Sequence, residues 1–254
     1  MKKIITENEY SKNVKGDRAM KKKTVAVIMT AVMAMGMVSA VSVQAGVEDK
    51  TLIVGFDAEY PPYGYMDENG EYTGFDLELA QAVCDIEGWE LVKKPINWDS
   101  KDMELNSGSI DCIWNGFTMN GREDDYTFSE PYVDNSQVIV VAEDSGIEKL
   151  TDLAGKTVGV QAASAALDLL NSEEEGGQKE LADTFGSLNE FADYNTAFTE
   201  LQAGALDALA IDVGVAKYQL NSRGEGFKIL DETLNTEQYA IGFKKGNTEL
   251  CDIV

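Results

Sequence analysis

One arginine follows a short run of residues that suits the binding of a small anion. In the segment WNGFTMNGREDDYTFSEPY (114–132), Arg122 comes just after a Gly-Phe-Thr turn that itself follows an apolar strand. Backbone N–H groups, the Thr118 hydroxyl and the guanidinium all lie between residues 115 and 122. A guanidinium forms paired hydrogen bonds with a carboxylate, and oriented amides add further donors. The segment therefore predicts an anion site.

A carboxylate lies at the end of another predicted strand. Asp212 directly follows the apolar run ALDALAI (205–211). If Asp212 faces Arg122, the complementary ligand carries a carboxylate and an ammonium a short distance apart, as a free amino acid does. Tyr60 and Trp98 each lie near a strand end, where they would enclose the ligand's side chain and exclude water, which strengthens both charge pairs.

The elements that position these residues alternate between strands and helices. An apolar run with helical spacing (74–88) ends at a glycine and follows a buried-type strand (51–56). Further strands are predicted at 109–114, 136–142, 156–161, 205–211 and 239–245, and further helices at 165–173 and 195–204. This order indicates the α/β class.

An internal repeat predicts two lobes built on one plan. The segment MELNSGSIDCIW (103–114) matches TELQAGALDALA (199–210), including a glycine at the end of the helix and an aspartate in the strand. Ligands of open α/β sheets bind beyond the carboxyl ends of the strands. These ends carry Asp57, Asn115 and Gly116 in the first lobe, and Gln161 and Asp212 in the second. Facing lobes would form a cleft between them.

Each of these residues also has a simpler explanation. Arg122 could pair with Glu123, Asp124 or Asp125 on a solvated turn, which would contribute little to stability. Asp212 could cap the following helix and Asp57 could cap a turn. The shared placement at equivalent strand ends favours a binding site.

Composition excludes several other functions. The formal charge is -24 over 254 residues, which argues against nucleic acid as a partner and against a basic membrane-binding surface. The chain contains no histidine, which argues against Ser-His triads and most zinc sites. No catalytic residue, metal or cofactor is predicted.

The N-terminal residues are typical of an export signal. Three lysines (21–23) precede an apolar run that ends in Val43-Gln44-Ala45, so cleavage is expected after about Ala45. The alternative to a cleaved signal is an uncleaved membrane anchor. Met20 is the expected true start, with residues 1–19 an upstream extension. No cysteine lies near the cleavage region, so no lipid anchor is predicted. We expect a protein of the periplasm or of the extracellular face of the cytoplasmic membrane.

Cysteine usage leaves two possibilities open. Export permits a disulfide, and Cys84 on a predicted helix with Cys112 on a predicted strand is the pair that could form one. Two buried free thiols are the alternative.

Several segments together resemble one family. They are GFDAEYPPYGYMDENGEYTGFDLELAQAV (55–83), SGSIDCIWNGFTMNGREDDYTFSEPY (107–132), LAGKTVGVQAASA (153–165) and LQAGALDALAIDVGVAKY (201–218). They are similar to the polar amino-acid substrate-binding proteins of ABC importers, from about Leu52 to the last residue. The resemblance implies a two-lobed periplasmic-binding-protein type II fold, each lobe a sheet flanked by helices, with a two-strand hinge. Such a protein, expected to be monomeric, closes on a polar or basic L-amino acid and delivers it to a membrane permease without chemistry.

The resemblance also implies a role for each site residue. Arg122 matches the arginine that binds the α-carboxylate, with the Gly116 N–H and Thr118 beside it. Ser164 and the Ala165 N–H match carboxylate donors of the second lobe, and Asp212 matches the ammonium acceptor. The remaining matches are the aromatic pair Tyr60 and Trp98, and Asp57, which implies a polar or cationic side chain on the ligand. Gln161 stands where some relatives have lysine, which argues against glutamine or an acidic amino acid.

The expected organisation after the signal is a first lobe (46–136), a second lobe (137–233) and a return to the first lobe (234–254). Relatives of this kind continue further, so the C-terminus is expected to be truncated. Two rival functions remain. A secreted lyase or dehydratase on the same fold would need proton transfer by Asp57 or Glu59, and a sensory ligand-binding domain would signal to a membrane co-receptor.

Overall fold

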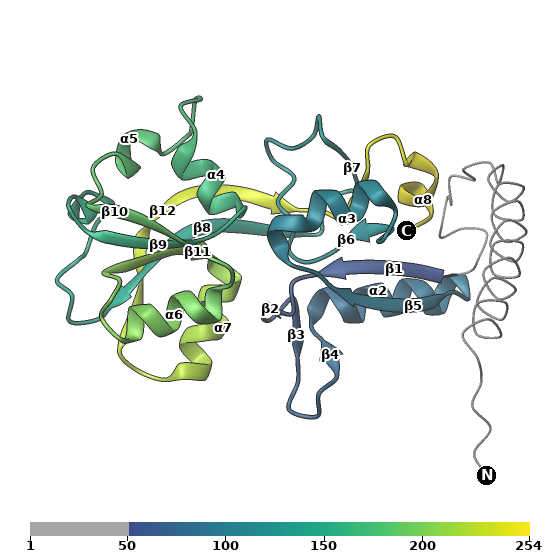
Figure 1. Ribbon diagram of the computed structural model, residues 1–254, viewed down its shortest axis with the longest axis horizontal. Helices are drawn as coiled ribbons and strands as arrows, with labels where there is room; N and C mark the ends of the chain where they lie inside the picture. The colour runs from purple at the N-terminus through teal and green to yellow at the C-terminus, as the bar shows by residue number, and fades with distance from the viewer. Residues whose placement is uncertain (1–50) are drawn as a thin grey trace, which may run out of the picture. The chain divides into compact units, whose positions relative to one another are not determined.

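Two five-stranded sheets connected by two long strands organise the chain (Figure 1). The computed structural model describes residues 51–254, so the predicted export signal and the extension before it lie outside the described residues. The first sheet contains β1 (Thr51–Phe56), β5 (Glu90–Pro95), β6 (Cys112–Ile113), β7 (Tyr126–Phe128) and β13 (Gly242–Lys244). The second contains β8 (Val133–Ala142), β9 (Thr157–Gln161), β10 (Ser187–Phe191), β11 (Ala208–Asp212) and β12 (Phe227–Tyr239). We call the two sheets with their helices the first and second lobes.

Helices cover both sheets, which confirms the predicted α/β class (Figure 1). The first lobe carries α2 (Phe75–Glu87), the 3-10 turn η1 (Trp98–Ser100), α3 (Lys101–Ser107) and α8 (Thr248–Ile253). The second carries the 3-10 turn η2 (Leu150–Leu153), α4 (Ala165–Asn171), α5 (Lys179–Ala182), α6 (Tyr194–Gln202) and α7 (Val213–Arg223). A small sheet of β2 (Glu59–Tyr60), β3 (Gly64–Met66) and β4 (Tyr72–Thr73) completes the elements. No helix between residues 51 and 254 has the length and apolar character needed to cross a membrane.

The repeated aspartates have the same structural role in both lobes. Asp111 Oδ2 accepts a hydrogen bond from Ile53 N at 2.7 Å, and Asp207 Oδ2 accepts one from Thr157 N at 2.8 Å. Each carboxylate thus ties a helix-to-strand turn to the start of the neighbouring parallel strand. The strand predicted at 109–114 is shorter in the structure, because Ser109 N still bonds to the carbonyl of Glu104 in the preceding helix turn. This shared construction places the carboxyl ends of the central strands at one edge of each sheet.

The two long strands β8 and β12 connect the lobes as an antiparallel pair. Their register runs from Val133 opposite Tyr239 to Ala142 opposite Phe227, with irregularities near Thr233. After β12 the chain re-enters the first sheet through β13, which pairs with β6 and β7. Within residues 51–254, the chain therefore passes between the lobes only at β8 and β12.

Both faces of each sheet are buried, as expected for strands flanked by helices. Leu52, Val54 and Phe56 of β1 pack with α2, and Val158 and Val160 of β9 pack with α4. Cys84 and Cys112 lie in the first of these cores as buried free thiols. The structure thus contains the free-thiol alternative and no Cys84–Cys112 disulfide.

Candidate functional site

The predicted site residues meet between the lobes, at the carboxyl ends of the central strands. A cavity there is lined by Tyr60, Trp98, Asn115, Gly116, Thr118, Arg122, Gln161, Ser164, Ala165 and Asp212. Asp57, the remaining predicted residue, lies beside it and lines a larger cavity. The enclosed cavity has a volume of about 10 Å³, about the space of one water molecule. The lobes are therefore closed, and a larger molecule enters only if they separate.

Arg122 provides a positive charge on the first-lobe wall. Its guanidinium stacks over the Phe117 ring at 5.1 Å, and its NH1 points toward the Thr118 carbonyl at 3.4 Å. Its NH2 donates to Asp168 Oδ2 of α4 at 2.6 Å. Arg122 therefore pairs across the cleft, and the proposed pairing with Glu123, Asp124 or Asp125 on its own turn is absent from the ion pairs of residues 51–254.

A buried lysine accompanies Arg122 and was not among the predicted site residues. Lys101 at the start of α3 is 5% exposed, lies over the Trp98 ring and donates to the Ala163 carbonyl across the cleft at 3.1 Å. Burial, together with the nearby Arg122 charge, lowers the pKa of Lys101. Ala163 has a φ of 54°, a left-handed conformation that is strained for a residue with a side chain. The sequence signal for Lys101 was its position shortly after Trp98, one of the predicted aromatic site residues.

Thr118 and Gly116 act differently from what the resemblance implied. The Thr118 hydroxyl donates to Glu237 Oε1 at 2.8 Å, so its oxygen is left as an acceptor for a ligand. In this closed form the Gly116 N–H donates to the buried Asp76 carboxylate, while Gly116 itself lines the cavity. Gly116 has a φ of 58°, and an added Cβ would lie 2.9 Å from the Tyr239 ring, so only glycine fits here.

The backbone N–H of Thr118 is left as a donor for a ligand, on the side where Arg122 lies. Thr118 forms a bridge opposite Tyr239, and the flanking bonds run from Met119 N to Gln238 O and from Ala240 N to Phe117 O. In this pattern the N–H and C=O of Thr118 point away from β12, on the side where Arg122 NH1 lies. Across the cleft, Ser164 caps α4 by accepting from Leu167 N at 3.1 Å, and its hydroxyl hydrogen remains able to donate. These groups together suit a carboxylate.

Asp212 provides the negative charge on the second-lobe wall. It is 3% exposed and occupies the N-cap position of α7, as the simpler explanation expected, but its side chain makes no capping hydrogen bond. Its Oδ1 accepts from Tyr239 OH at 2.6 Å, Gln137 Nε2 at 2.6 Å and Asn135 Nδ2 at 2.8 Å. The Tyr60 side chain also interacts with this carboxylate. Burial, and next the Glu237 carboxylate, raise the pKa of Asp212 to about 6.

Four residues of the connecting strands belong to the site and were not predicted. Asn135 and Gln137 share one face of β8, and Glu237 and Tyr239 share one face of β12. All four are buried. Their sequence neighbours are also polar (134–137 and 235–238), so no apolar alternation marked these positions as buried.

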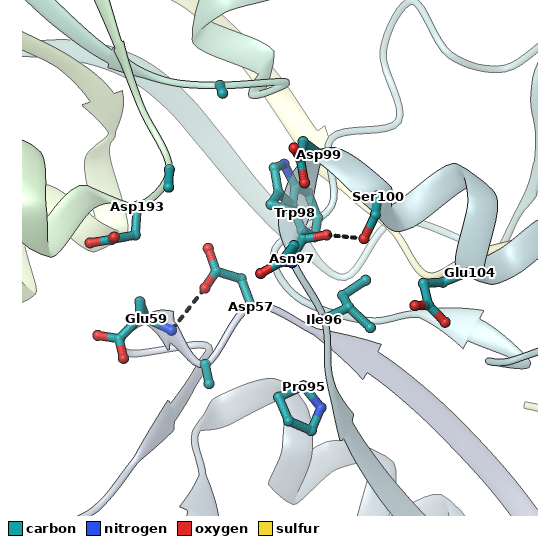
Figure 2. A pocket seen from close by; sticks show the side chains of 13 residues that line it. Asp57, Glu59, Pro95, Ile96, Asn97, Trp98, Asp99, Ser100, Glu104 and Asp193 are labelled. Carbon is teal, nitrogen blue, oxygen red and sulfur yellow. Dashed lines mark hydrogen bonds between the residues drawn. The ribbon is translucent and has the colours of Figure 1, made fainter.

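Asp57 lines a larger cavity of about 670 Å³ (Figure 2). Its partner Gln161 lines the enclosed cavity. Asp57 Oδ1 accepts from Glu59 N at 2.8 Å, which is the predicted turn cap, while its Oδ2 accepts from Gln161 Nε2 across the cleft at 2.7 Å. Burial raises the pKa of Asp57 to about 6. The carboxylates of the larger cavity are Asp57, Glu59, Asp99, Glu104 and Asp193.

The other predicted residues frame the space between these charges. Tyr60 is 7% exposed, with its hydroxyl 3.4 Å from that of Tyr239, and Trp98 packs edge-on against Phe117. Asn115 Oδ1 accepts from Asp57 N at 2.8 Å, and its buried Nδ2 has no hydrogen-bond partner among residues 51–254. The cavity thus has donors at one end, acceptors at the other and aromatic walls between.

Comparison with known proteins identifies the family. The model of the bacterial extracellular solute-binding proteins, family 3, matches residues 52–254. The arginine-binding extracellular protein ArtP of Bacillus subtilis is 32% identical over 237 residues, which cover 91% of this chain and 89% of ArtP. The L-cystine-binding protein TcyJ of Escherichia coli is 29% identical over 235 residues, which cover 88% of this chain and 85% of TcyJ.

Solved structures agree in fold. An ABC uptake transporter substrate-binding protein from Streptococcus pneumoniae with bound histidine has a TM-score of 0.76 and 34% identity, over 81% of this chain and 84% of that one. An ancestral arginine-binding protein bound to arginine has a TM-score of 0.71 and 38% identity, over 80% and 88% of the chains. These matches confirm the type II periplasmic-binding fold and a binding protein rather than an enzyme. The chain belongs to the bacterial extracellular solute-binding proteins, family 3.

Proposed function

We propose that this protein captures a polar or basic L-amino acid between its lobes, outside the cytoplasm, and delivers it to an ABC importer. One observation carries the proposal: Arg122 and Asp212 line the same enclosed cavity from opposite lobes. A ligand with a carboxylate and an ammonium on one carbon matches both charges. Closure of the lobes around it would exclude water and strengthen both interactions.

The surroundings of Asp57 support a cationic or strongly polar side chain. Asp57 lies where a side chain leaving the enclosed cavity would pass, and the larger cavity beyond it presents four further carboxylates. A guanidinium or ammonium would be attracted there, whereas an acidic side chain would be repelled. The names of ArtP and of the arginine-bound relatives agree with this direction.

The transport role rests on family membership and on the closed conformation. Homologues include an extracellular protein and the arginine-binding periplasmic protein of Mannheimia haemolytica. The predicted export signal agrees with that location. We propose that the closed, loaded form is the one recognised by a membrane permease.

A thermal-shift screen tests the binding function. The protein is melted alone and with each standard L-amino acid, ornithine, citrulline and cystine. A ligand at about a thousand times its Kd adds about 4 kcal/mol to the free energy of unfolding, so a clear rise in Tm is expected with basic or polar amino acids. A cooperative melt that none of these compounds shifts would contradict the proposal.

A further inference from the structure

Two buried carboxylates, not one, lie at the end of the cavity that would receive the ammonium. Asp212 is 3% exposed and Glu237 is 4% exposed. They share the same two amide donors: Asn135 Nδ2 lies 2.8 Å from each, and Gln137 Nε2 lies 2.6 Å from Asp212 and 2.8 Å from Glu237. The amides hold the two acids in one network.

Among residues 51–254, no positive charge pairs with either carboxylate. The other titratable groups that face Asp212 are the phenols of Tyr60, Tyr63, Tyr194 and Tyr239, whose pKa values are all raised by burial, so they are neutral. Two carboxylates in one buried site are costly to ionise together without a cation.

We propose that Asp212 and Glu237 act as one acidic pair that holds a proton when the site is empty and exchanges it for the ligand's ammonium. This inference rests on the proposed function. On binding, the shared carboxyl O–H loses its proton to water, and the ammonium keeps its three N–H groups and donates to the ionised pair. At mildly acidic pH, where the empty pair is protonated, amino-acid capture therefore releases a proton, and Glu237 is a positioning residue that sets how strongly the site selects a full positive charge.

Glu237 also orients the Thr118 hydroxyl in the cavity that Asp212 lines. It accepts the Thr118 hydroxyl at 2.8 Å, which turns the lone pairs of that oxygen toward other donors. Thr118 lines the enclosed cavity together with Asp212. Glu237 thus orients a neutral acceptor beside the charged one. The raised pKa of Asp212, about 6, indicates where the proton exchange would occur.

Isothermal titration of the full chain with L-arginine and, separately, with its neutral-side-chain analogue L-citrulline tests the inference. Titrations run from about pH 8 to pH 5, and those near pH 6 are repeated in buffers of different ionisation enthalpy. We expect both probes to bind about tenfold more weakly at pH 5 than at pH 8, since one pH unit below the pKa protonates about nine-tenths of the pair. Near pH 6, the binding heat should vary with the buffer because a proton is released.

Two variants separate this pair from other acids. Glu237→Gln keeps the shape and an acceptor for Thr118 but removes the second charge, so its affinity should change less than about threefold over the same pH range. Glu232→Gln changes an exposed carboxylate on the same strand and should behave as the wild type. L-citrulline has no side-chain cation, so its proton release cannot come from a charge pair with Asp57.

The outcomes distinguish the inference from the proposed function. Measurements on the wild type alone can overturn the inference, whether or not the variant folds. Either the same affinity at all pH values or binding heats independent of the buffer would do so. Unchanged proton release in a folded Glu237→Gln protein would also overturn it. No binding of either probe at any pH would instead contradict the proposed function and remove the basis of the inference.

Discussion

Arg122 of the first lobe and Asp168 of the second form an ion pair across the closed cleft, with 2.6 Å between Arg122 NH2 and Asp168 Oδ2. The guanidinium that the ligand's carboxylate would use therefore also holds the lobes together. Lys101, bonded to the Ala163 carbonyl, and Gln161, bonded to Asp57, cross the same cleft. Closure and ligand binding thus depend on the same group of residues.

Replacing Arg122 by alanine should remove binding and leave the fold intact. Loss of one partner of a charged hydrogen-bonded pair costs about 2–5 kcal/mol, so Kd should rise at least about thirtyfold. Calorimetry measures the affinity, and circular dichroism checks the fold. Arg223→Ala, which removes an arginine that lies over Phe198 on the second lobe, is the control. Wild-type affinity in a folded Arg122→Ala protein would rule out the carboxylate role.

Replacing Asp168 by asparagine should weaken closure rather than recognition. The Asp168 side chain is 63% exposed, so the pair contributes less than about 1 kcal/mol, and Kd should rise about twofold to fivefold. Small-angle scattering should show a more open ligand-free protein and an unchanged loaded one. The control Asp183→Asn breaks the Lys179–Asp183 pair within the second lobe and should change neither quantity. Identical scattering of wild type and Asp168→Asn without ligand would argue against a role in closure.

Asparagine at position 57 should change the order of preferred ligands. The neutral amide can still accept from Glu59 N, but it no longer attracts a cation. L-arginine should bind about tenfold more weakly or worse, and L-citrulline should change less than about threefold, because hydrogen bonds to charged groups contribute about 1.5–3 kcal/mol. Competitive titrations of both ligands measure this, with Asp144→Asn, an exposed carboxylate that lines neither cavity, as the control. An unaltered preference would remove Asp57 from side-chain selection.

Asp76 should make the protein less stable as the pH rises. Burial raises its pKa from 3.8 to about 7, so the folded protein holds a proton that the unfolded chain releases between these values. Its contribution to the free energy of unfolding is full below pH 3.8 and is lost as the pH rises through about 7.

The variant Asp76→Asn should therefore be more stable than the wild type at about pH 8, by about 1–3 kcal/mol, and gain less at about pH 5. The amide oxygen can still accept from Gly116 N and Tyr132 OH. Urea unfolding at both pH values measures the difference. Asp85→Asn, on the exposed side of the same helix, should change stability little at either pH. An equal loss of stability at both pH values would contradict this assignment.

The sequence predicted those site residues that lie at strand ends. Strand and helix periodicity places Asp57, Asn115, Gln161 and Asp212 at the carboxyl edges of two sheets, and the repeat pairs these edges. The conclusion required only local patterns and the geometry of parallel strands.

Their partners could not be predicted in the same way. Asp168 is 46 residues from Arg122, and Glu237 is 119 residues from Thr118. Which residues face each other there depends on how β8 and β12 pair, including their irregular register, and on how the lobes close. No local pattern indicates that Asp76, in the first turn of the predicted helix 74–88, accepts a hydrogen bond from the Gly116 N–H.

Truncated ligands test whether the site holds both charged groups of an amino acid at once. Calorimetry at about pH 8 compares L-arginine with agmatine, which lacks the carboxylate, and with desamino-arginine, which lacks the ammonium. We expect L-arginine to bind and each analogue to bind at least about thirtyfold more weakly, because each leaves Arg122 or Asp212 without its partner. An analogue that binds as tightly as L-arginine would contradict this expectation.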